Sequence, residues 1–114
     1  MSLAGTTFRA LTNSSRGTLN ADTRMTFESE AGARITGAYS GGTIDTGRVV
    51  GLRTSDSTVT MLYQCITTAG ELKAGRASAK FSRDADRRLR MHLDWQWLTG
   101  DRATGVSDWI EEKQ

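Results

Sequence analysis

The segment from Arg88 to Trp97 alternates polar and apolar residues without interruption, and this alternation constrains the fold more than any other feature of the chain. In a β-strand, successive side chains point to opposite faces, so this segment would have one apolar and one polar face. A helix would scatter the same apolar residues around its circumference. The segment is therefore predicted to be a strand with one buried face, formed by Leu89, Met91, Leu93, Trp95 and Trp97.

The rest of the chain also has the pattern of strands separated by turns. It contains twelve glycines and no proline, and no stretch carries an apolar stripe at helical spacing. Alternation predicts eight strands, at residues 6–12, 22–29, 33–39, 44–54, 58–67, 71–83, 87–98 and 104–112. Gly, Asn, Asp and Ser clusters predict turns at 13–17, 30–32, 40–43, 55–57, 69–70, 84–86 and 99–102.

Short connections between consecutive strands predict an antiparallel meander. Because no helix is available to cover one face of an open sheet, closure into a small lipocalin-like or calycin-like barrel is expected. A β-sandwich is the alternative. The glycines at 37, 47, 51 and 75 would suit the coiling of such a barrel. The chain fits a single domain, residues 1–114, with residues 1–5 expected to be disordered or derived from cloning.

Composition excludes several classes of protein. The apolar runs are only a few residues long, so no membrane partner is expected, and a cytoplasmic location is the default. The single cysteine, Cys65, cannot form an intramolecular disulfide or a cysteine-based zinc site, and is interpreted as a buried apolar residue. The net charge of +2 is mild, and Asp84 and Asp86 interrupt the arginines nearby, so nucleic acid is not expected as a partner. No metal or cofactor is expected, and a homodimer is left open.

The predicted hairpins bring three residues into one cross-strand row. A two-residue turn at 69–70 would place Tyr63 opposite Arg76, and a four-residue loop before residue 88 would place Arg76 opposite Trp95. Trp97 would lie on the same inward face. Arg76 would then be a cation among aromatic side chains, where it needs an anionic partner. Tyr63, Arg76, Trp95 and Trp97 are therefore the candidate ligand-binding residues, and the leading hypothesis is a barrel that binds an anionic or amphipathic small molecule.

Alternatives to each part of this site remain open. Arg76 could be paired internally with Glu28, Glu71, Asp108 or Glu111, or could lie outside the barrel if the register shifted by one residue. The two tryptophans could be core residues only. An enzyme could use His92, Asp94, Glu71 or Asp101 at the barrel mouth, and a chain with a solid core could be a structural or interaction module.

The spacing of glycines and aromatic residues resembles that of a family of short bacterial proteins often labelled N-acetylglutamate synthase. That resemblance implies a shared fold, and the label would imply an amino-acid N-acetyltransferase. Members usually have a histidine after a Tyr-Gln pair, where this chain has Cys65. The resemblance spans about residues 37–112 and rests on Gly37 to Ile44, Gly47, Gly51, Tyr63-Gln64, Gly70-Glu71-Leu72, Gly75, Trp95-Gln96-Trp97, Gly100-Asp101-Arg102, Gly105 and Ile110-Glu111-Glu112.

Overall fold

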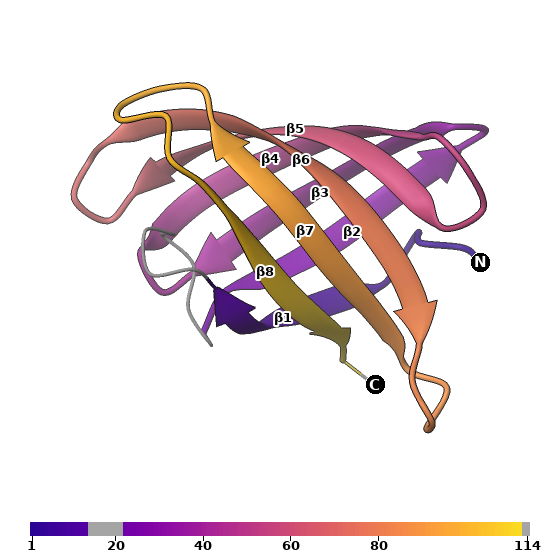
Figure 1. Cartoon of the computed structure of the whole chain (residues 1–114). Helices are drawn as coiled ribbons and strands as arrows, with labels where there is room; N and C mark the ends of the chain where they lie inside the picture. Colours follow the sequence, from indigo (N-terminus) through magenta and orange to yellow (C-terminus); the bar gives the residue numbers. More distant parts are fainter. Residues whose placement is uncertain (14–21, 113–114) are drawn as a thin grey trace.

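The structure, a computed structural model, describes residues 1–13 and 22–112. Its strands follow one another around a closed antiparallel barrel, in which β8 pairs back onto β1 (Figure 1). The predicted barrel is thus confirmed, and each predicted strand lies within two residues of an observed one. Residues 14–17 of the turn predicted at 13–17 lie outside the described residues. The strands are β1 (Thr7–Asn13), β2 (Arg24–Ala31), β3 (Arg34–Gly41), β4 (Ile44–Arg53), β5 (Thr58–Thr67), β6 (Leu72–Arg83), β7 (Leu89–Trp97) and β8 (Thr104–Glu111).

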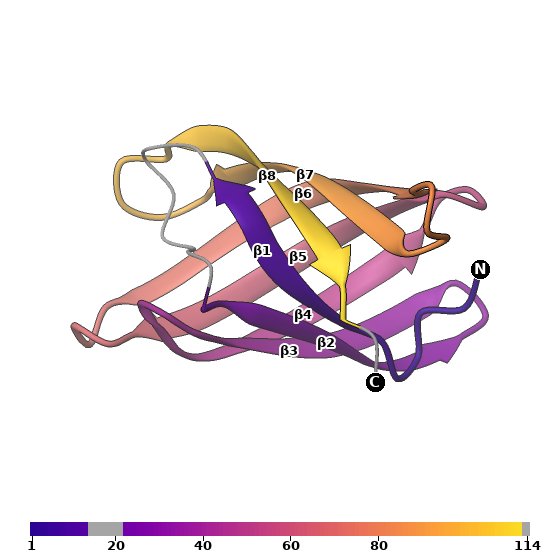
Figure 2. The ribbon, with the colours of Figure 1, turned by 90° about the horizontal axis from the view of Figure 1, so that it is seen from below.

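The two ends of the barrel are built from different segments (Figure 2). One end, called here the rim, contains the β3–β4, β5–β6 and β7–β8 loops. Hydrogen bonds join the first two of these loops to each other and the third to the start of β6. Thr68 N–H donates to the Thr43 carbonyl at 2.9 Å, and Leu98 N–H donates to the Ala74 carbonyl at 2.8 Å. The other end, called the base, holds the N-terminus, the last described residue Glu112 and the remaining described loops. The rim loops are therefore held together rather than projecting separately.

Alternate residues of every strand fill the interior with apolar side chains, as the sequence predicts. Phe8, Phe27 and Phe81 form an edge-to-face cluster toward the base, with ring centroids 5.7, 5.9 and 6.2 Å apart. Among the described residues, the buried polar side chains are all uncharged: Thr23, Thr67 and Ser107. The middle of the barrel is therefore an apolar environment in which an unpaired polar atom is costly.

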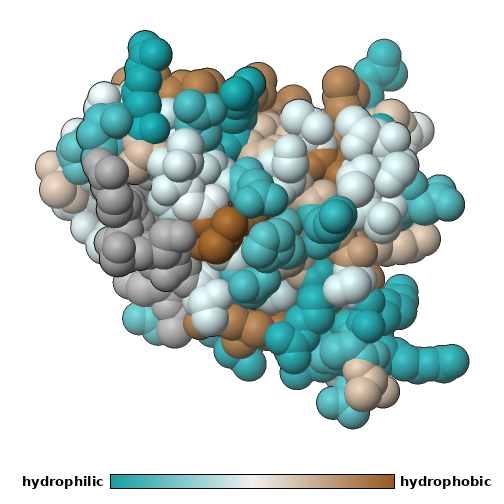
Figure 3. Space-filling model, viewed as in Figure 1, coloured by the Kyte–Doolittle hydropathy of each residue, from teal (hydrophilic) through white to brown (hydrophobic). Residues whose placement is uncertain are grey.

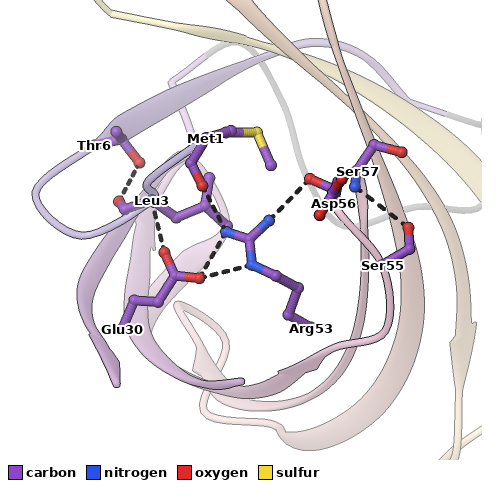
Figure 4. Close-up of polar contacts among 8 residues, drawn as sticks. All are labelled: Met1, Leu3, Thr6, Glu30, Arg53, Ser55, Asp56 and Ser57. Atoms are coloured by element: carbon purple, nitrogen blue, oxygen red, sulfur yellow. Dashed lines mark hydrogen bonds and ion pairs between the residues drawn. The ribbon is translucent and has the colours of Figure 1, made fainter. Parts of the chain in front are cut away.

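The N-terminal segment packs into the base and belongs to the core (Figure 4). Leu3 is fully buried, and its N–H donates to Glu30 Oε1 at 2.9 Å. Arg53 binds the other carboxylate oxygen of Glu30 through Nε, at 2.7 Å, and also donates to the Met1 carbonyl at 3.0 Å. Residues 1–5, expected from the sequence to be disordered or derived from cloning, are therefore anchored by a half-buried ion pair and by Leu3.

The β5–β6 hairpin has a loop that is one residue longer than the sequence predicts. Thr67 N–H donates to the Glu71 carbonyl at 2.9 Å, Gly70 N–H donates to Thr67 at 2.8 Å, and Gly70 has a left-handed φ of 82°. This is the three-residue loop in which a turn is followed by a left-handed residue. It pairs Tyr63 with Gly75, so that Arg76 is opposite Leu62.

The β6–β7 hairpin has a loop that is one residue shorter than the sequence predicts. Asp84 N–H donates to the Arg88 carbonyl at 3.0 Å, and Arg87 occupies the left-handed region with φ 64°. The loop therefore holds three residues instead of the four expected, and it pairs Arg76 with Gln96 rather than with Trp95. A one-residue shift of register moves a side chain to the opposite face of the sheet, so Arg76 lies outside the barrel.

The outer surface mixes polar side chains with exposed apolar ones. In Figure 3, apolar groups gather along the upper edge of the molecule, where β4 to β6 run in Figure 1. Val50 and Leu62, which are partners across β4 and β5, are both more than half exposed. Within residues 1–13 and 22–112, no helix has the length and apolar character needed to cross a membrane.

Candidate functional site

Four aromatic side chains meet inside the half of the barrel that is nearer the rim. Tyr39 of β3 contacts Tyr63 of β5, with ring centroids 6.0 Å apart and planes at 87°. Tyr63 in turn contacts Trp97 of β7 at 5.4 Å and 74°, and Trp97 lies 6.5 Å from Trp95. The cluster crosses the interior from β3 to β7 and presents both ring faces and ring edges. Such a wall suits the flat apolar part of a small molecule.

Glycines on the neighbouring strands make room for these rings. Gly47 is the register partner of Tyr39, and a Cβ on Gly47 would come within 2.5 Å of Cε1 of that ring. Gly75 holds the corresponding position beside Tyr63 and is also the partner of Trp97. The rings therefore lie flat against the backbone of the adjacent strand, and the sequence specifies this by pairing an aromatic residue with a glycine.

Two hydrogen-bond donors of the cluster are buried without a partner in the described part of the chain. These are the hydroxyl of Tyr39 and Nε1–H of Trp97. Each residue is only 4% exposed, so water in the bulk solvent does not solvate these atoms. Because buried polar atoms are nearly always hydrogen-bonded in proteins, two orphaned donors in one cluster are unusual. The pair is what a site for a hydrogen-bond acceptor would contain.

The phenols of the site stay protonated. Burial is the main reason that the pKa of Tyr39 is raised far above its usual value, and the neighbouring Cys65 raises it further. Burial, followed by Cys65, also raises the pKa of Tyr63. The thiol of Cys65 lies beside the Tyr39 hydroxyl, but the two atoms do not have the geometry of a hydrogen bond. At neutral pH the Tyr39 hydroxyl is therefore a donor and not an anion.

A lysine lies at the rim edge of this cluster. Lys73, at the start of β6, is the register partner of Cys65. It lies on the same face of the strand as the inward residues Gly75 and Ala77. Its ammonium nitrogen lies 4.0 Å from the centroid of the Trp97 ring. This is a cation–π contact, in which the ring face attracts the positive charge. The site thus has a neutral aromatic interior and a cation at its rim edge.

Three of the four predicted site residues lie together in the barrel, and one does not. Tyr63, Trp95 and Trp97 are inward and belong to the aromatic cluster. The prediction that Arg76 faces the interior was wrong, because both hairpin loops contain three residues. Arg76 is exposed, and its Nε donates to Gln96 Oε1 at 3.1 Å. Glu28, Asp108 and Glu111, offered as its partners, contact other groups: Arg48, His92 and Leu89 N–H respectively.

The residues of the enzyme alternative do not form one site. His92 and Asp94 lie on the outer face, where His92 Nδ1 is 2.7 Å from Asp108 and Nε2 is 3.9 Å from Asp94. Glu71 and Asp101 are exposed rim residues, and Asp101 accepts the Ala103 N–H at 2.9 Å. Among the described residues, no three His, Cys, Asp or Glu side chains are placed to hold a metal ion.

Three residues in or beside the cluster were not assigned to the site from the sequence: Tyr39, Cys65 and Lys73. Tyr39 follows the inward positions 35 and 37, so alternation alone could have placed it in the interior. Cys65 was expected to be buried, and it is, at 3% exposed. Lys73 alternates with Gly75, Ala77 and Ala79, so alternation within β6 points it inward, but the predicted β5–β6 turn assigned the opposite face of β6 to the interior.

Comparison with known proteins assigns the chain to a family. A family model described as avidin-like protein matches residues 1–112, which is nearly the whole chain. No curated protein and no solved structure matches it. The family match overturns the resemblance to proteins labelled N-acetylglutamate synthase, so the acyltransferase activity which that label implied has no support. The closed eight-stranded barrel without a helix in its described residues fits the match. The chain belongs to the avidin-like family.

Proposed function

We propose that this protein binds a small molecule inside the rim half of its barrel, among Tyr39, Tyr63, Cys65, Trp95 and Trp97. Membership of the avidin-like family supports this proposal, and so does the gathering of aromatic rings at one end of the interior. The chemistry of the walls favours an amphipathic ligand. Its flat apolar part would pack against the rings, and an uncharged oxygen or nitrogen acceptor would face the buried donors.

The observation that carries the proposal is the pair of orphaned donors, Tyr39 Oη–H and Trp97 Nε1–H. A buried donor without a partner costs about 1–3 kcal/mol of stability, so the unliganded barrel is less stable than one with these groups paired or absent. An acceptor on a ligand would remove that cost. A site that retains two such groups is thus poised for binding at the expense of folding stability.

Native mass spectrometry of the purified protein, followed by calorimetric titration, tests the proposal. We expect a bound small molecule, or saturable binding from a panel of cyclic amides, ureas and aromatic acids that includes biotin, a ligand of avidin-like proteins. The same spectra report whether the homodimer left open by the sequence forms. If no compound binds and no mass is carried through purification, the proposal is contradicted.

A single substitution separates a binding role of Tyr39 from a purely structural one. Tyr39→Phe keeps the ring but deletes the orphaned hydroxyl, so the unliganded protein should become more stable, by about 1 kcal/mol, while ligand affinity falls about tenfold. Tyr63→Phe is the matched control, because Tyr63 is only partly buried and its hydroxyl is not orphaned. It should change both quantities less. A loss of stability in Tyr39→Phe with unchanged affinity would assign the hydroxyl to the fold.

A further inference from the structure

We propose that the tip of the β6–β7 hairpin, residues 83–88, binds the phosphate groups of duplex DNA without reading its sequence. The tip lies at the base, so this inference is independent of the ligand site proposed at the rim end of the interior. It departs from the expectation drawn from the sequence, which counted Asp84 and Asp86 as charges that offset the nearby arginines. In the structure, Asp84 has a different role.

The carboxylate of Asp84 is engaged inside the loop. Its Oδ1 accepts Asp86 N–H at 2.9 Å and Arg88 N–H at 3.0 Å, and its Oδ2 accepts Nε–H of Arg90 at 3.2 Å. One of these three donors is charged, and such a bond is stronger than a neutral one. Asp84 therefore orders the loop and pairs with Arg90, which lies outside the tip. It is not the partner of the arginines that the loop presents.

The three arginines of the tip have no carboxylate partner. Arg83 and Arg87 are exposed, and Arg88 is half-buried. Within residues 1–13 and 22–112, no carboxylate lies within ion-pair distance of any of the three. The Arg83 guanidinium donates to the Arg87 carbonyl at 2.8 Å, which holds it against the loop while its other N–H groups remain for a ligand. Of the carboxylates on the tip, only that of Asp86 is left to oppose this positive charge.

The tip projects as a narrow two-stranded ribbon. β5 starts at Thr58, opposite Lys80, and β8 leaves β7 beside Arg90, so the backbones of residues 83–89 pair only with one another among the described residues. In Figure 1 this loop stands apart from the other loops of the base, and the same corner of Figure 3 is a hydrophilic projection. The major groove of B-form DNA is about 12 Å wide and admits a two-stranded β-ribbon.

The composition of the tip favours DNA over a lipid surface. The planar guanidinium of arginine donates two parallel hydrogen bonds to a phosphate group, which a lysine cannot do. Ala85 is the one apolar residue of the tip, so no large side chain is available to enter a bilayer. Electrostatic membrane contacts typically use clusters of about four to eight basic residues, more than the tip contains. Duplex RNA fits less well, because its major groove is deep and narrow.

Fluorescence anisotropy of a labelled mixed-sequence DNA duplex of about 20 base pairs tests the proposal. We expect a dissociation constant of roughly 10⁻⁵ M at low salt, independent of the sequence of the duplex. The logarithm of the affinity should fall with the logarithm of the salt concentration with a slope of about −3, the value for three phosphate contacts. Vesicles that contain phosphatidylserine are titrated in parallel.

Paired substitutions separate the tip from the net charge of the protein. Arg83→Gln with Arg87→Gln should weaken binding about tenfold and reduce the salt slope to about −1. Arg76→Gln with Arg102→Gln is the matched control, because it removes the same charge from exposed residues on the outer face and at the rim. The control pair should change the affinity less than about twofold and leave the slope unaltered.

A variant that gains affinity guards against loss of binding through misfolding. Asp86→Asn removes the carboxylate that opposes the arginines and should tighten binding about threefold. Asp45→Asn makes the same change at an exposed position of the rim, and it should leave binding unchanged.

Three results would overturn the inference. The first is the absence of saturable duplex binding by wild type at low salt, and the second is an equal loss of affinity in the tip pair and in the control pair. The third is tip-dependent binding to the vesicles without binding to the duplex, which would assign the arginines to a lipid surface. None of these results affects the proposed function, because small-molecule binding is measured separately and at the other end of the barrel.

Discussion

The ring of Tyr63 lies directly over the backbone of Gly75, its partner on the neighbouring strand. A Cβ at position 75 would come within 2.5 Å of Cζ and 2.6 Å of the hydroxyl oxygen. The ring cannot simply swing aside, because Tyr39 contacts one part of it and Trp97 another. The arrangement of the whole aromatic cluster therefore depends on the absence of a side chain at Gly75.

Gly75→Ala should destabilise the protein by about 1–3 kcal/mol, the usual cost of overpacking a well-packed core. The reason is the clash with Tyr63, so the cost should shrink by about 1 kcal/mol or more when Gly75→Ala is made in a Tyr63→Ala background. Urea denaturation of the four proteins in this double-mutant cycle measures both quantities. Equal costs in the two backgrounds would contradict the contact.

The pairing of Tyr63 with Gly75 shows which parts of the structure the sequence alone predicts. Alternation predicts all eight strands and the closed barrel, because period-two patterning reports which residues share a face. It also places Tyr63, Trp95 and Trp97 inside. Loop length is harder to predict: Thr68-Ala69-Gly70 and Asp84-Ala85-Asp86-Arg87 are compatible with turns of two, three or four residues. Only the left-handed φ of Gly70 and Arg87 shows which turn forms.

One residue of loop length decides whether Arg76 or Ala77 faces the core, and adjacent substitutions test the outcome. Ala77→Leu should cost about 1–3 kcal/mol, because Ala77 is 3% exposed and a larger side chain would overpack the core to which it belongs. Arg76→Leu should change stability by less than about 0.5 kcal/mol, as expected for an exposed site. Urea midpoints measured side by side provide the comparison. The opposite order of costs would restore the register predicted from the sequence.

The contacts of the candidate site were less predictable than the fold. Orphaned donors such as Tyr39 Oη–H and Trp97 Nε1–H have no signature in the sequence, because the absence of a partner is a property of three-dimensional packing. Lys73 was missed for a different reason: it alternates with the apolar residues Gly75 and Ala77, but the predicted β5–β6 turn assigned the opposite face of β6 to the interior. The inward-facing cation of β6 is therefore Lys73 and not Arg76.

At the opposite end of the barrel, Leu3 gives a test of the N-terminal anchor. Leu3→Ala removes a fully buried side chain and should cost about 2–4 kcal/mol. Leu52→Ala is the matched control, because Leu52 is 57% exposed and its truncation should cost well under 1 kcal/mol. Thermal and urea unfolding measure the difference. If Leu3→Ala were as mild as the control, the first residues would be dispensable for the fold.

The Glu30 carboxylate gives this anchor a dependence on pH whose sign can be derived. The N–H of Leu3, and then Arg53, hold the pKa of Glu30 below its usual value against an opposing effect of burial. A carboxylate whose pKa is lower in the folded state contributes stability above its unfolded pKa, about 4.3, and this contribution is lost as pH falls through the folded value. We therefore expect wild type to lose more stability than Glu30→Gln between about pH 5 and pH 3.

At pH 7 we expect wild type to be the more stable of the two proteins. The amide of Glu30→Gln keeps one hydrogen bond but leaves the half-buried Arg53 without its charge partner. Urea titrations of both proteins across this range measure the difference, and parallel curves would show that the ion pair does not contribute to folding.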